Sequence, residues 1–72
     1  MQYRFSLSLY PDELMRMYQG HARYLRVRTD SGKVIELAAD RLRNVMTHAG
    51  VHGVFLLTTD DKNRFVSLQQ LA

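Results

Sequence analysis

Residues 48–59, HAGVHGVFLLTT, decide how the chain folds. The segment begins as the end of a predicted helix, turns through a corner that contains Gly50, His52 and Gly53, and continues into the most apolar strand of the sequence. Glycine tolerates positive φ because it has no Cβ, so we expect both glycines to adopt positive φ at this corner. We expect His52 to anchor the backbone there.

The strand that follows, residues 54–59, is apolar on both of its faces. Phe55 and Leu57 alternate with Val54 and Leu56, whereas an antiparallel strand with one solvated face is normally apolar on the other face only. We assign Phe55 and Leu57 to the core, because apolar residues of the next strand can pack with them. Val54 and Leu56 then need a cover, which is either a helix of the same chain or a second subunit. The second case predicts a homodimer, or binding of a protein partner, through Val54 and Leu56.

The remaining sequence divides into short elements. Apolar and polar residues alternate over residues 2–9, which predicts a strand with one buried face. Further strands are predicted at residues 22–29, 34–37 and 65–68. Pro11 suits the first turn of a short helix, which Gly20 is expected to close in a left-handed conformation. A second helix is predicted for residues 39–49, ending just before Gly50, with His48 in its last turn and with one apolar stripe formed by Leu42, Val45, Met46 and Ala49.

The resulting order, βαββαββ, predicts an α+β fold. Two hairpins indicate an antiparallel sheet, which we expect to be small, curved and partly closed like a barrel, with the two short helices over its open side or its end. Residues 1–72 form one predicted domain. A chain of this length has a small core, and dimerisation is a common way to enlarge it.

Composition excludes several classes of protein. Apolar residues make up 46% of the chain, which is typical of a folded globular domain. There is no cysteine, so disulfides and thiolate metal sites are excluded. No apolar run approaches the roughly 20 residues of a membrane span, and the alternating N-terminal segment is unlike a signal sequence. We therefore expect a soluble cytoplasmic protein. The formal charge of +3 is mildly basic and does not by itself indicate a partner.

Several segments together resemble a known family. They are the opening YRFSLSL, the YQG sequence at residues 18–20, the Leu42–Arg43 pair and the closing run THAGVHGVFLLTTDDKNRFVSLQQL. In these the chain is similar to a family of small bacterial proteins, known chiefly from gammaproteobacteria, that is described as a domain of unknown function. The resemblance implies a soluble bacterial protein with this fold. It implies no catalytic residue and no cofactor.

Metal binding is not expected. His48 and His52 are four residues apart, a spacing at which helical histidines can share a metal, but Gly50 interrupts the helix between them. Zinc sites generally use three or four protein ligands, and His21 is distant in the sequence. Asp60, with the Asp61 and Asn63 that follow it, lacks the loop length, glycine and final glutamate of a calcium-binding EF-hand, so we predict a solvated turn.

No catalytic arrangement is expected either. Ser6, Ser8 and Ser67 lie on predicted strands, and the sequence places neither a histidine nor an acid beside them. Acid–base or nucleophilic catalysis needs a reactive group, a base and a pocket that excludes water, and small chains rarely enclose such a pocket. We therefore predict a binding module that is not an enzyme and uses no cofactor.

The basic strand at residues 22–29 provides the alternative function. Tyr24, Arg26 and Arg28 share one face of this strand, and Arg23 precedes them. Single-stranded nucleic acid binds to sheets by stacking bases on aromatic rings while arginines contact phosphates. The competing interpretation is an ordinary exposed face, on which the arginines cover apolar neighbours and pair with Glu36 and Asp30.

Overall fold

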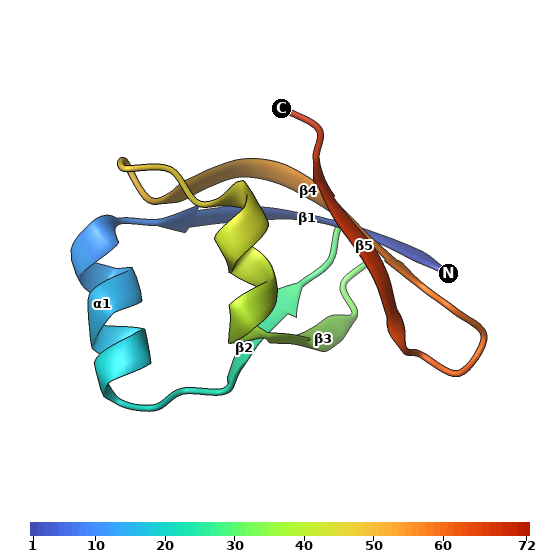
Figure 1. Cartoon of the computed structure of the whole chain (residues 1–72). Coiled ribbons are helices and arrows are strands. Elements are labelled where there is room, and N and C mark those ends of the chain that lie inside the picture. Colours follow the sequence, from blue (N-terminus) through green and yellow to red (C-terminus); the bar gives the residue numbers. More distant parts are fainter.

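A computed structural model describes all residues, 1–72, and confirms the predicted α+β class. One α-helix, one 3-10 helix and five strands follow one another in this order (Figure 1): β1 (Gln2–Leu9), α1 (Pro11–Gln19), β2 (Tyr24–Arg28), β3 (Val34–Ala38), η1 (Ala39–Val45), β4 (Val51–Thr59) and β5 (Phe65–Gln70). The strands form two antiparallel sheets, one with the order β1-β4-β5 and the other containing β2 and β3.

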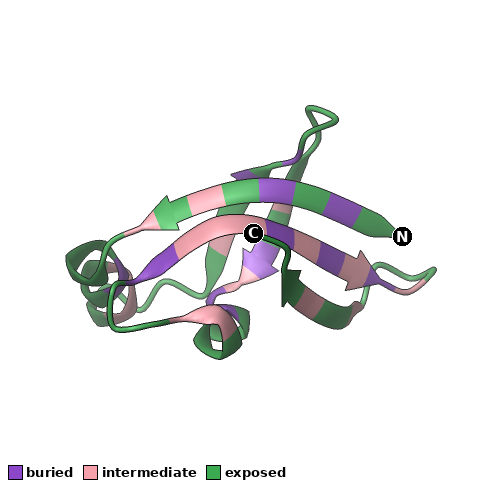
Figure 2. Cartoon of the chain, turned by 90° about the horizontal axis from the view of Figure 1, so that it is seen from above, coloured by how far each residue is buried: buried purple, intermediate pink, exposed green.

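The larger sheet is built around β4, which pairs with β1 on one edge and with β5 on the other. β1 and β4 pair along their whole lengths, with Phe5 opposite Phe55. The two rings stack with their centroids 5.8 Å apart, and both side chains are fully buried. Burial alternates along both strands, as the bands of Figure 2 show. The assignment of Phe55 and Leu57 to the core is therefore confirmed.

All the other elements lie on one face of this sheet. In Figure 1, α1, η1 and the β2–β3 hairpin are all on the same side of β1 and β4. Each contributes apolar side chains to a single core: Leu14 from α1, Val27 from β2, Leu37 from β3 and Leu42 from η1. The predicted closure into a barrel is not confirmed. The backbone N–H of Asp30 donates to the Arg4 carbonyl at 2.9 Å, but no strand ladder joins the two sheets.

The second predicted helix is shorter than expected and of a different type. Residues 39–45 form a 3-10 helix, and Met46 already has an extended conformation. Residues 47–50 form a tight turn instead, in which the backbones of Thr47 and Gly50 exchange two hydrogen bonds of 2.9 and 3.0 Å. The Thr47 hydroxyl also accepts from the Ala49 N–H. The prediction that His48 lies in a last helical turn, with Gly50 capping it, was therefore wrong.

Helix α1 ends one residue later than predicted. Gly20 has an ordinary φ of −77°, and His21 takes the left-handed conformation at φ 58°. The Ala22 N–H donates to the Met17 carbonyl and the His21 N–H to that of Tyr18, which is the Schellman arrangement. Because Ala22 closes the helix, the next strand begins at Tyr24 and not at residue 22.

Both corner glycines have positive φ, as predicted: 102° at Gly50 and 142° at Gly53. Strand β4 begins at Val51, however, so Gly53 lies inside the strand and not before it. The end of the chain lies close to Gly53, because a Cβ there would collide with the carbonyl oxygen of Ala72.

The turn between β4 and β5 is organised by one carboxylate. Asp60 accepts hydrogen bonds from the backbone N–H groups of Lys62 and Arg64 and from Nε of Arg64. The bond from the Arg64 backbone is the main reason that the pKa of Asp60 lies below its ordinary value. The carboxylate therefore stabilises the folded protein fully at pH values above its ordinary pKa. This contribution is lost as the pH falls through the lowered pKa of the folded state.

Alanine at Gly50 or Gly53 is expected to destabilise the protein. A Cβ on Gly50 would collide with the carbonyl oxygen of Leu9, and one on Gly53 with that of Ala72. We expect each substitution to lower the free energy of unfolding by more than about 1 kcal/mol, the cost of a left-handed conformation alone. Urea denaturation followed by circular dichroism measures this change.

Gly32→Ala is the matched control. Gly32 also has positive φ, at 88°, but no atom lies near the position of its missing Cβ. Its substitution should show the conformational cost without the collision. Equal losses for Gly32→Ala and Gly50→Ala would contradict the steric role of the corner.

Candidate functional site

The exposed face of β2 carries the predicted aromatic and basic residues. Tyr24, Arg26 and Arg28 are exposed, while Leu25 and Val27 between them point toward the core. Tyr24 is 63% exposed, which is unusual for so large a ring. The structure thus brings these side chains together on one accessible surface.

The arginines of the chain divide into two groups. Four of them pair with an aspartate: Arg4 with Asp30, Arg16 with Asp12, Arg43 with Asp40 and Arg64 with Asp60. The other four have no carboxylate at salt-bridge distance, and we call them the unpaired arginines: Arg23, Arg26, Arg28 and Arg41. Three of them belong to β2 or the residue before it, and the fourth lies in η1.

The predicted pairing of the β2 arginines with acids does not occur. Glu36 lies directly opposite Arg26 in the β2–β3 register, but the two side chains form no salt bridge. Asp30 pairs with Arg4 of β1 instead. The β2 arginines therefore have no carboxylate within salt-bridge distance.

A cleft adjoins this face, between β3 and the β4–β5 hairpin. One part of it, with a volume of about 240 Å³, is lined by side chains that include Tyr24, Arg41 and Phe65. The Arg41 guanidinium stacks on the Phe65 ring, with Cζ 4.1 Å from the ring centroid. A second part, of about 200 Å³, extends toward Tyr3 and Lys33, and both parts share Glu36, Leu57, Thr59 and Asn63. We call the two parts together the β3–hairpin cleft.

Thr59 lines the cleft and contains a buried hydroxyl group without a partner. Its backbone is satisfied, because the N–H donates to the Met1 carbonyl and the carbonyl accepts from the N-terminal ammonium group. The side chain is 8% exposed, and Oγ1 makes no hydrogen bond. Unpaired buried hydroxyls are uncommon, because burying one without a bond costs about 1–3 kcal/mol.

The outer face of the larger sheet carries the predicted interface residues. Val54 and Leu56 are half-buried and point away from the core. In the register, Val54 lies opposite Ser6, and Leu56 lies between Arg4 and Gln69. The helices lie on the other side of the sheet, so neither of them supplies the cover that the sequence suggested (Figure 1).

His52 anchors the corner, as predicted. Its Nε2 lies 2.6 Å from the Ala49 carbonyl oxygen, which can only accept, so Nε2 carries the proton. In the neutral ring Nδ1 then accepts from the Ser8 hydroxyl at 2.8 Å. Tyr10 packs edge-on against the imidazole, with centroids 4.8 Å apart. His48 is exposed, and nowhere do three or more histidine or acidic side chains gather as a possible metal site.

The contact between Ser8 and His52 was missed at the sequence level. The prediction that no histidine lies beside Ser8 was wrong, because antiparallel pairing of β1 with β4 places Ser8 directly opposite His52. Aligning β1 with β4 as antiparallel partners along their full lengths would have predicted this contact. None of the hollows on the surface is lined by either residue.

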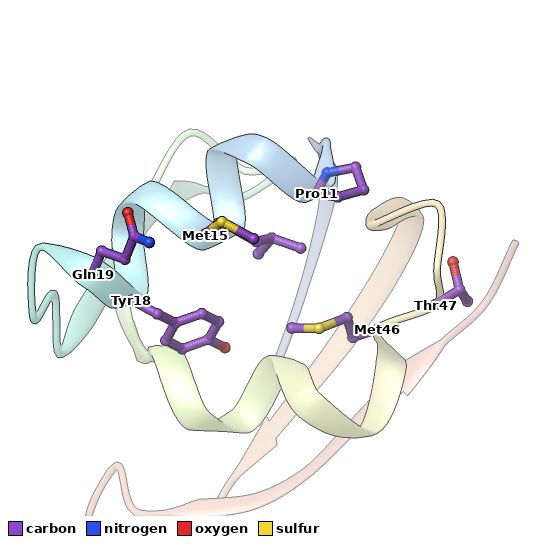
Figure 3. A pocket seen from close by; sticks show the side chains of 7 residues that line it. Pro11, Met15, Tyr18, Gln19, Met46 and Thr47 are labelled. Atoms are coloured by element: carbon purple, nitrogen blue, oxygen red, sulfur yellow. The ribbon is translucent and has the colours of Figure 1, made fainter.

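The largest hollow, of about 430 Å³, was not predicted either. It is an apolar groove between α1 and the end of η1, lined by Leu14 together with the residues labelled in Figure 3: Pro11, Met15, Tyr18, Gln19, Met46 and Thr47. The Tyr18 hydroxyl donates to the Ala39 carbonyl at 3.1 Å and so ties the two helices together below the groove.

A family model described as "Protein of unknown function (DUF2835)" matches residues 1–71. No curated protein and no solved structure matches the chain. None of its helices combines the length and the apolar character that a membrane crossing requires.

Removing the His52 ring is expected to loosen the corner. His52→Ala loses the bonds to Ala49 and Ser8 and should lower the free energy of unfolding by about 1 kcal/mol. His48→Ala is the control, since its exposed ring makes no hydrogen bond, and it should change stability by less than about 0.5 kcal/mol. Chemical denaturation of both variants tests the difference, and equal effects would contradict the anchoring role.

Proposed function

The chain belongs to the DUF2835 family of proteins of unknown function, and we propose that it binds single-stranded nucleic acid through the exposed face of β2. The observation that carries the proposal is the distribution of the unpaired arginines. Three of them lie on β2 or just before it, and Arg41 lines the same cleft as Tyr24, whereas the other arginines are each paired with an aspartate. A phosphate can bind an unpaired guanidinium without first displacing a carboxylate.

The geometry of β2 supports an extended ligand. Tyr24, Arg26 and Arg28 alternate along one face of the strand, so successive side chains stand about 6.5 Å apart. An exposed ring followed by two cations can stack a base and contact the phosphates next to it. Because such contacts involve the phosphate backbone and any base face, we expect little sequence preference from this face alone.

The proposed role is binding and not catalysis. The best candidate for reactive chemistry is the pair formed by Ser8 and His52. Its Nε2 is already committed to the Ala49 carbonyl, and no acid orients the ring. We therefore assign this pair to the stability of the corner.

Self-association through Val54 and Leu56 is a second candidate function. One observation favours it: these apolar side chains lie at the centre of a three-stranded sheet whose outer face no other element covers. A second copy that packs the same face against this one would form a symmetric dimer.

The nucleic-acid proposal predicts a loss of affinity when the unpaired arginines are removed. Arg26→Ala combined with Arg28→Ala should weaken binding of a labelled single-stranded oligonucleotide, measured by fluorescence anisotropy at low salt. The slope of log affinity against log salt concentration should become shallower by about 1.4, the value for two phosphate contacts on a single strand.

Arg16→Ala combined with Arg43→Ala is the matched control. It removes the same total charge, but from arginines that are paired with aspartates away from β2. We expect a smaller loss of affinity and an almost unchanged slope. Equal losses in the two double variants would mean that net charge alone attracts the oligonucleotide, and absence of wild-type binding would refute the proposal.

Self-association predicts that lysine at the sheet face separates the subunits. Val54→Lys with Leu56→Lys should leave a folded chain, because both side chains point away from the core, and should convert a wild-type dimer into a monomer in sedimentation velocity. Met15→Lys with Val34→Lys introduces the same charge at two exposed apolar residues on other elements and should leave the dimer intact. A monomeric wild type would exclude this candidate.

A further inference from the structure

The β3–hairpin cleft opens beside Tyr24, and its walls are suited to a flat, aromatic ligand. Tyr24 lines one part of it, and the Arg41 guanidinium lies over Phe65 in the same part. Unstacked bases bind between such surfaces, both aromatic rings and arginine planes. One base of a nucleic-acid strand bound along the β2 face can therefore turn out of that strand and enter the cleft.

The polar groups that line the cleft include hydrogen-bond acceptors and donors. Glu36 is shared by both parts, and the oxygens of its carboxylate accept hydrogen bonds. The Asn63 amide can donate and accept, and the Thr59 hydroxyl can do either. This combination matches a base edge that presents an amino group next to a ring acceptor, as in cytosine or adenine. Uracil presents a carbonyl oxygen in place of the amino group, and the Glu36 carboxylate would repel it.

The unpartnered Thr59 hydroxyl is the second observation. A buried hydroxyl without a bond destabilises the folded protein, and nothing in the sheet requires an oxygen at this position. A ligand seated in the cleft can supply the missing bond once rotation about χ1 turns Oγ1 toward it. The hydroxyl then stabilises the complex, although it destabilises the free protein.

We propose that the β3–hairpin cleft binds one unstacked nucleobase that bears an exocyclic amino group, with Glu36 accepting from that amino group and Thr59 bonding to the base edge. The inference rests on the proposed single-strand binding by β2 and adds base selection to it. The β2 face holds the backbone, and the cleft distinguishes one base from another.

Two labelled RNA homopolymers of equal length, oligocytidylate and oligouridylate, test the inference. They differ at the base edge but carry the same phosphates, so the ratio of their affinities isolates the contribution of the base. For the wild type we expect oligocytidylate to bind at least about fivefold more tightly, the lower limit for one good base contact.

Glu36→Gln should reduce this ratio toward one, because the amide can donate to the uracil carbonyl as well as accept from cytosine. It also removes a negative charge, which strengthens binding of both oligonucleotides. Asp61→Asn controls for that effect, since it removes the same charge from the exposed β4–β5 turn and does not line the cleft. It should leave the ratio unchanged.

Thr59→Val supplies a second readout. We expect its melting temperature to equal or exceed that of the wild type, because the unpaired hydroxyl is gone, while affinity for oligocytidylate falls about fivefold. Thr58→Val is the control on the opposite face of the sheet and should leave oligocytidylate binding unchanged. A purely structural Thr59 would change stability and not affinity.

The outcomes separate the two proposals. Equal wild-type affinities for both homopolymers, or a preference that survives Glu36→Gln and Thr59→Val, would overturn the base site while leaving backbone binding by β2 intact. Absence of binding to either homopolymer at low salt would overturn both.

Discussion

The pairing of β1 with β4 is the constraint on which the rest of the structure depends. It places Phe5 against Phe55, and the remaining elements pack around these two stacked rings on one side of the sheet. The same pairing sets Ser8 opposite His52 and so fixes the corner through which the chain enters β4. A register shift of one residue would exchange the faces of the strand and bring Val54 and Leu56 into the core.

The alternation along β4 also explains why several surfaces lie so close together. Residues on one face form the core and then, toward the end of the strand, the lining of the β3–hairpin cleft, to which Leu57 and Thr59 belong. Residues on the other face form the uncovered side of the sheet. The β2–β3 hairpin shares no ladder with this sheet, and its outward face is free to carry charge. One central strand thus separates the two candidate binding surfaces.

Sequence patterns predicted the parts of the fold that depend on local alternation. The positions of the strands and the burial of Phe55 and Leu57 follow from the alternation of apolar and polar residues and from side-chain size. The positive φ of Gly50 and Gly53 follows from the absence of a Cβ. The 3-10 helix did not follow, because the apolar stripe of Leu42, Val45 and Met46 fits either helix type, and backbone bonds between Thr47 and Gly50 decide where it ends. His21, and not Gly20, takes the left-handed position, because the hydrogen bonds of His21 and Ala22 close the helix one residue later. For the candidate site, the sequence predicted which residues share the exposed face of β2 but not their contacts. Which arginines remain unpaired, and that Thr59 lines a cleft, depend on contacts between elements distant in the sequence.

The three-stranded sheet has a further consequence for the kinetics of folding. β5 joins the central strand through a short local turn, whereas β1 comes from the other end of the chain: Gln2 pairs with Thr58, and the Thr59 N–H donates to the Met1 carbonyl. Such contacts close long loops before they gain stability, so proteins dominated by them fold slowly, on the order of milliseconds to seconds. During that time the edge of β4 that pairs with β1 is open and able to associate with other unfolded chains. The rate at which β1 docks on β4 therefore governs how long this protein is vulnerable to aggregation.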